Sequence, residues 1–153
     1  EIRLSLVGSE MCIRDSYTTL QMKKEKIVIE QRLNSKSPNI IWNLIGTPEG
    51  MGKWLADEIE QENDRLTFTW GKVWSNHEIR HARVIECEKF CNIRFVWEDE
   101  EEENTYVDLK MERNTLTGDF TLHITDFAEE EDVDALQSIW AENMKRLHHT
   151  SGI

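Results

Sequence analysis

The sequence predicts an α+β fold in which an antiparallel sheet carries one long C-terminal helix on its apolar face. Three observations support this fold class. Both prolines of the chain stand at helix-start signals, the segment after Asp57 alternates apolar and polar residues, and an apolar stripe at helical spacing follows it. The predicted element order is a strand, two short helices, about six strands and one long helix.

Length, composition and charge limit the classes of function. The chain has 153 residues, about the size of one domain. Its 39% apolar and 31% charged residues are typical of a globular protein rather than a disordered one. Thirty acidic against eighteen basic residues give a net charge of −12, which disfavours binding to nucleic-acid phosphates and to anionic membranes. No apolar run approaches the roughly 20 residues of a membrane span, so we predict none.

The first segment differs from the rest of the chain. Residues 1–21 show no sustained helical or strand period and no signal-peptide core. The string LSLVGSEMCIRDS within them resembles a translated read-end artefact that recurs at the ends of unrelated environmental sequences, and an ordinary disordered leader is the alternative. We therefore predict a non-native or disordered leader at 1–21 and a single domain at 22–153.

The first strand and two short helices follow this leader. The apolar residues of 27–33 predict a strand. Ser37-Pro38 is an N-cap followed by proline at the first helical position, which predicts a helix over 38–45. Thr47-Pro48 repeats the signal for a second helix that we expect to run through Leu55.

Four further segments predict strands with one apolar face each. In each of them every second residue is apolar, and Asn63-Asp64 supplies a tight turn before the first; the segments are 66–70, 93–97, 107–111 and 120–124. This pattern indicates an antiparallel sheet with one solvated face. The other face needs a cover.

The predicted cover is a helix over 133–148. Its apolar residues recur at helical spacing, namely Val133, Leu136, Ile139, Trp140, Met144 and Leu147. Acidic residues crowd its start and basic residues its end, so both groups complement the helix dipole.

This ordered set of elements resembles the START-like, or SRPBCC, superfamily over nearly all of residues 24–150. The resemblance rests on SPNIIW at 37–42, WLAD at 54–57, the hairpin over 84–97 and the final helix with Trp140. It is strongest for small stand-alone bacterial members related to heat-shock chaperone ATPase activator homologues. It implies the helix-grip fold, in which a curved antiparallel sheet of about six to seven strands wraps around the long C-terminal helix, often with an apolar cavity between them.

One string has the spacing of a zinc-peptidase motif. On a helix, His77 and His81 would share a zinc ion with Glu78 as general base. Ala82 and Val84 instead favour an extended segment, in which residues four apart lie roughly 13 Å apart. We predict a strand at 77–81, with histidines facing solvent or a cavity wall, and no metal.

Two other patterns receive structural interpretations. The six acidic residues at 98–103 repel one another and indicate a solvated loop; a weak calcium site or a docking surface for a basic partner is the alternative. Cys87 and Cys91 lack C-x-x-C spacing and are predicted to be free thiols. Such sparse cysteine use, with no export signal, favours the reducing cytoplasm.

The six tryptophans indicate an unusually aromatic interior, which forms either core or the wall of a ligand cavity. The residues that we predict to line such a cavity are Trp42, Trp54, Phe68, Trp70, Phe95, Trp97, Met111, Phe120, Leu122, Leu136, Trp140 and Met144. The inward strand positions look almost uniformly apolar, which is unsuited to acid–base catalysis.

Three classes of function follow. The first is a non-enzymatic module that binds a small apolar ligand or lipid, without a cofactor. The second is a protein-interaction module, co-chaperone-like as the resemblance suggests, with a filled core. The third is an enzyme of unrecognised chemistry, which a titratable group inside the cavity would favour.

Overall fold

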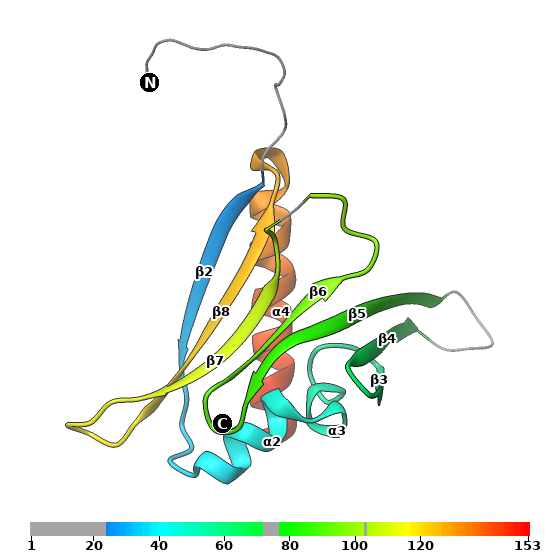
Figure 1. Ribbon diagram of the computed structural model, residues 1–153. Coiled ribbons are helices and arrows are strands. Elements are labelled where there is room, and N and C mark those ends of the chain that lie inside the picture. Colours follow the sequence, from blue (N-terminus) through cyan, green and yellow to red (C-terminus); the bar gives the residue numbers. More distant parts are fainter. Residues whose placement is uncertain (1–23, 72–76, 103) are drawn as a thin grey trace, which may run out of the picture.

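Figure 1 shows a computed structural model of the protein, which describes residues 24–71, 77–102 and 104–153. The predicted leader at 1–21 lies outside the described residues. Trp74 and Glu103 also lie outside them.

Within the described residues, seven strands form one antiparallel sheet in the spatial order β2-β8-β7-β6-β5-β4-β3. The strands are β2 (Glu25–Arg32), β3 (Glu58–Glu62), β4 (Arg65–Gly71), β5 (His77–Glu88), β6 (Asn92–Trp97), β7 (Val107–Arg113) and β8 (Phe120–Ala128). β2 and β3 are therefore the two edges. The predicted strands and the antiparallel sheet are confirmed.

The strand at 77–81 is confirmed as part of β5, which extends over twelve residues. The edge strand β3 is one that the sequence did not place. It carries charged or amide side chains at every position except Ile59, so its alternation is weak. The turn to β4 is the expected one, and Asn63 adopts the left-handed conformation there, with φ of 57°.

Helices α2 (Pro38–Gly46) and α3 (Pro48–Met51) begin at the predicted caps. The hydroxyl oxygen of Thr47 accepts a hydrogen bond of 3.0 Å from the Gly50 amide. The prediction that the second helix runs through Leu55 is wrong, because α3 ends at Met51. Gly50 and Gly52 flank that residue, and glycine lowers helix stability.

After the 3₁₀ turn η1 (Glu130–Asp132), helix α4 (Val133–Ser151) runs along one face of the sheet. It ends one turn later than predicted, at the left-handed Gly152 with φ of 77°. Figure 1 shows α2 and α3 at the end of the molecule where α4 finishes, while the β6–β7 connection lies near the end where α4 begins. This is the curved sheet around a helix that the sequence predicted.

The tightly packed core lies between α2, α3 and the sheet. Trp54 is completely buried there, and its indole nitrogen donates a hydrogen bond of 2.8 Å to the carbonyl of Leu44. The inward residues of the central strands, among them Leu109, Leu122 and Ile124, are also fully buried. In the ranges that the structure describes, no helix is both long and apolar enough to span a bilayer.

Candidate functional site

A cavity of about 360 Å³ lies between the sheet and α4. It is lined by Leu55, Phe68, Trp70, Glu78, Arg80, Phe95, Trp97, Val107, Asp126, Leu136, Ile139, Trp140 and Asn143. The structure therefore places six of the twelve predicted residues on its walls, namely Phe68, Trp70, Phe95, Trp97, Leu136 and Trp140. The side chain of Trp140 is also largely buried, with 5% of its surface exposed.

The other six predicted residues lie elsewhere. Five are buried in the core, where α2, α3 and the sheet pack closely: Trp42, Trp54, Met111, Phe120 and Leu122. Met144 instead lines a second hollow of about 620 Å³ between β2 and the C-terminal half of α4. Periodicity identifies which face a residue belongs to, but it does not separate the filled half of that face from the hollow half.

The aromatic wall of the cavity comes from β4 and β6, which lie on either side of β5. The ring centroids of Phe68 and Trp97 are 4.9 Å apart, although these residues belong to strands that are not hydrogen-bonded to each other. On β5, Arg80 pairs with Phe68, and the fully buried Ala82 pairs with Leu66 and Trp97. The methyl group of Ala82 leaves space for the larger rings to meet above β5.

Neighbouring rings of this wall pack against one another. Phe68 stacks on Trp70 with an interplanar angle of 15° and a centroid distance of 5.8 Å. Phe95 meets Trp97 edge to face at 5.4 Å. Such pairs add about 0.5–1.5 kcal/mol beyond the area that they bury, so the wall is preformed without a ligand.

Asp126 on β8 is the first polar group of the cavity. One carboxylate oxygen accepts a hydrogen bond of 2.9 Å from the indole nitrogen of Trp140, and the other accepts one of 2.7 Å from the amide of Phe127. Burial raises the pKa of this carboxyl, and the two hydrogen bonds and the charges of Arg80 and Lys24 only partly offset that rise.

Arg80 and Glu78 on β5 also line the cavity. The guanidinium of Arg80 lies 4.0 Å from the ring centroid of Trp97, a cation–π distance. Its Nε and Nη2 atoms donate hydrogen bonds of 3.1 and 2.8 Å to the two carboxylate oxygens of Asp99.

The prediction that the inward strand positions are almost uniformly apolar is contradicted by three residues that line the cavity, Glu78, Arg80 and Asp126. Asp126 continues the inward series of Phe120, Leu122 and Ile124, so extending the alternation by two residues would have identified it. Glu78 and Arg80 gave no such signal, because polar residues occupy both faces of β5 around them.

The histidines of the zinc-peptidase string share the other face of β5. Side chains alternate along a strand, so His77 and His81 point away from the face that carries Glu78 and Arg80. The Nδ1 atom of His81 lies 3.1 Å from the hydroxyl of Thr67 on the neighbouring strand. The histidines and the glutamate of the string are therefore on opposite sides of the sheet.

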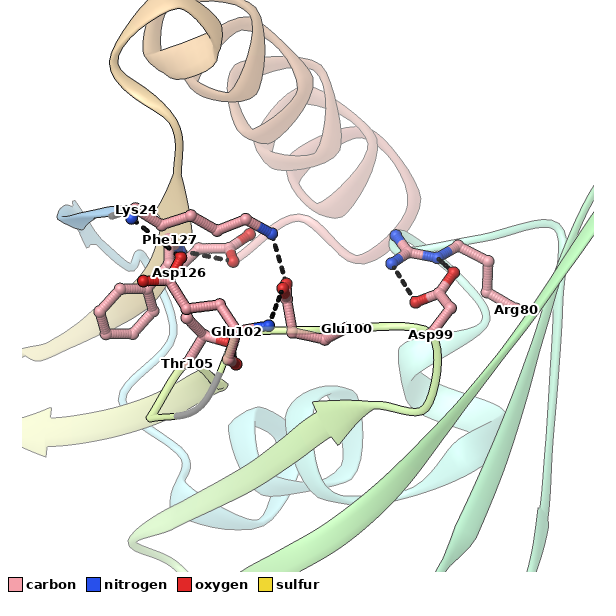
Figure 2. Close-up of polar contacts among 8 residues, drawn as sticks. All are labelled: Lys24, Arg80, Asp99, Glu100, Glu102, Thr105, Asp126 and Phe127. Atoms are coloured by element: carbon pink, nitrogen blue, oxygen red, sulfur yellow. Dashed lines mark hydrogen bonds and ion pairs between the residues drawn. The ribbon is translucent and has the colours of Figure 1, made fainter. Parts of the chain in front are cut away.

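The acidic loop, defined here as residues 98–102, lies beside Arg80 and Asp126 of the cavity (Figure 2). Ion pairs connect it to three other parts of the chain. Glu98 accepts hydrogen bonds of 2.9 and 3.1 Å from Arg65 on β4. Figure 2 shows the next two contacts, in which Asp99 pairs with Arg80 and Glu100 pairs with the ammonium of Lys24. The expected solvated loop is therefore organised by ion pairs.

These contacts alter the acidity of the loop. The hydrogen bond from Arg80 lowers the pKa of Asp99, and its positive charge adds to that effect. Burial acts to raise the pKa of Glu100, yet the Lys24 hydrogen bond and charge, with the amides of the loop, lower it overall. The loop therefore remains negatively charged beside the cavity at neutral pH.

Sequence and structure comparisons place the chain among known proteins. The model of the START-like superfamily domain matches residues 21–153. A solution structure from Bacteroides fragilis is 42% identical, with a TM-score of 0.58, and the match covers 84% of this chain and 92% of that one. No curated protein matches the sequence.

More distant structures share the fold alone. The solution structure of the Aha1 dimer from Colwellia psychrerythraea is 17% identical over 84% of this chain and 97% of that one, with a TM-score of 0.65. A crystal structure from Bacillus thuringiensis is 12% identical over 84% of this chain and all of that one, with a TM-score of 0.66.

Proposed function

Because the chain belongs to the START-like superfamily, we propose that it is a non-enzymatic binding module that holds a small, mostly apolar ligand between the sheet and α4. The observation that carries this proposal is the cavity of about 360 Å³ in a domain whose neighbouring core is filled. Its volume lies at the lower end of the roughly 300–1,000 Å³ typical of small-molecule sites, and its walls are mainly apolar, with five aromatic side chains.

The arrangement of the walls favours a flat ligand. Trp70 and Trp97 are only partly buried although they pack against the core, so their rings retain surface that a bound molecule would cover. Burying apolar surface contributes roughly 25 cal/mol per Å², which makes two tryptophan faces a substantial source of affinity. The interaction-module alternative called for a filled core, and the cavity therefore favours the ligand-binding proposal.

The cysteines support a proposal about the compartment of the protein. Cys87 and Cys91 are free thiols, and Cys87 is exposed. We infer a reducing compartment such as the cytoplasm, where exposed thiols persist.

A binding experiment with a cavity-filling variant tests the proposal. We expect 2-naphthalenemethanol, a flat and neutral probe, to bind the native protein in a calorimetric titration. Leu136→Trp fills the cavity and should weaken this binding by roughly tenfold or more. Leu122, by contrast, is unsuitable as a filling site because it is fully buried in the core.

Met144→Trp is the matched control, because it adds the same side chain to α4 but at the second hollow. It should leave the affinity for the probe unchanged. Absence of binding to the native protein, or equal binding by both variants, would contradict the proposal. Native mass spectrometry of the purified protein would then identify any molecule that occupies the cavity.

A further inference from the structure

The polar groups of the cavity have an excess of negative charge. Asp126 faces it from β8, Glu78 and Arg80 from β5, and Asn143 from α4. The acidic loop adds Asp99, which already neutralises Arg80 through two hydrogen bonds. Lys24 reaches this region as well, but its ammonium is paired with Glu100. Both cations therefore have partners, whereas among residues 24–71, 77–102 and 104–153 no cation lies within hydrogen-bond distance of Asp126.

Asp126 retains capacity to accept a hydrogen bond. A carboxylate offers about four lone-pair sites, and the protein uses one on each oxygen, through Trp140 and Phe127. The indole of Trp140 fixes the orientation of the carboxylate from α4. A ligand in the cavity therefore meets an oriented acceptor beside an aromatic wall.

The aromatic wall itself favours positive charge. The faces of tryptophan rings attract cations, and Arg80 already uses one face of Trp97 at 4.0 Å. Trp70, Phe68 and Trp140 present further aromatic surface in the same cavity.

We infer that the ligand is a small planar amine, whose protonated nitrogen donates to Asp126 while its ring lies against the aromatic wall of Phe68, Trp70 and Trp97. This inference rests on the proposed function and specifies the chemical class of its ligand. The cavity of about 360 Å³ limits the ring system to one or two rings.

An anionic ligand is disfavoured by the same geometry. Its carboxylate would compete with Asp99 for Arg80 and would lie near Glu78 and Asp126. Like charges within such a partly desolvated space repel each other more strongly than in water. A fatty acid or an aromatic acid therefore has no unoccupied cation to bind among the residues that line this cavity.

The test compares three probes that share one ring system and differ in charge: 2-naphthylmethylamine, 2-naphthalenemethanol and 2-naphthoate. Each is titrated by calorimetry into the full-length protein at neutral pH. We expect the amine to bind about tenfold more tightly than the alcohol, and the acid to bind most weakly. Asp126→Asn should remove the preference, so that the amine and the alcohol bind this variant with about equal affinity.

Glu60→Gln on the edge strand β3 removes one exposed charge that does not line the cavity, so it controls for net charge; the preference for the amine should persist in this variant. If the alcohol binds as tightly as the amine, or the acid binds best, the inference is wrong and the proposed function stands. If none of the probes binds, the proposed function fails first. The probe comparison in the native protein needs no substitution, so it decides the question even if Asp126→Asn does not fold.

Discussion

At the scale of single residues, Asp126 links the stability of the protein to pH. Burial raises its pKa, so the native state binds this proton more tightly than the unfolded state does. The stabilisation from this group is complete below the unfolded pKa of about 3.9, and it is lost as the pH rises through the raised native pKa. Above its raised native pKa, the carboxyl of Asp126 is ionised in a partly desolvated place.

We predict that Asp126→Asn becomes more stable relative to the native protein as the pH rises from about 4 through the raised native pKa of Asp126. The amide stays neutral over this range, and its oxygen can still accept the hydrogen bond from Trp140. Thermal melts at several pH values measure the difference in Tm. Glu60→Gln, which removes an exposed carboxylate of the same sheet, controls for the loss of one charge. A difference for Asp126→Asn that falls with rising pH would contradict the assigned direction of the pKa shift.

The residues that line the cavity differ in how well their positions can be predicted from the sequence. The positions of Phe68, Phe95 and Trp140 on the cavity wall could be predicted, because these residues recur in the sequence with the period of a strand or a helix. The inward direction of Arg80 depends on its register opposite Phe68, which is a property of the β4–β5 pairing and not of β5 alone. A segment with polar residues on both faces carries no periodic signal for that register.

At the scale of elements, the corner between α2 and α3 depends on a glycine. A Cβ atom on Gly50 would lie 1.7 Å from the backbone carbonyl oxygen of Asn43, so any side chain here forces the two helices apart. These helices cover the part of the sheet next to the cavity, and their corner brings Met51 and Trp54 into the core.

We predict that Gly50→Ala destabilises the protein by about 3 kcal/mol or more, the upper part of the range for overpacking. Urea unfolding followed by tryptophan fluorescence measures this loss. Gly152→Ala is the control, because its site has open space around it and a left-handed φ of 77°. It should cost about 1–2 kcal/mol. A Gly50→Ala protein as stable as Gly152→Ala would show that the corner adjusts easily.

Strands with one buried face were predicted well from their alternation. The end of a helix that depends only on the preferences of neighbouring residues was predicted poorly. β4, β6, β7 and β8 each bury one face, and their alternation was sufficient to find them. The end of α3 depends on weak local preferences around Gly50 and Gly52, so its length was overestimated. The filled and hollow halves of the sheet face differ through the packing of α2 and α3, which no single strand encodes.

At the scale of the whole molecule, the described core begins at Ile27. Among the described residues before it, Lys24 makes ion-pair and hydrogen-bond contacts with the acidic loop. We predict that a chain that begins at Met22 and keeps Lys24 melts within about 4 °C of the full-length protein, a change of roughly 1 kcal/mol at this size. Calorimetry of both chains measures this difference. A larger drop would show that residues 1–21 contribute to the fold.

The two edge strands of the sheet affect how the protein behaves at high concentration. In the part of the chain that the structure describes, β2 and β3 each pair with one strand only, and such edges can recruit strands from other molecules into aggregates. The margin at β3 carries Glu58, Glu60 and Glu62, all exposed, so two copies that approach there meet with like charges. The charged residues that weaken the alternation of β3, and so kept it from being predicted, therefore also disfavour fibril-like association at this edge.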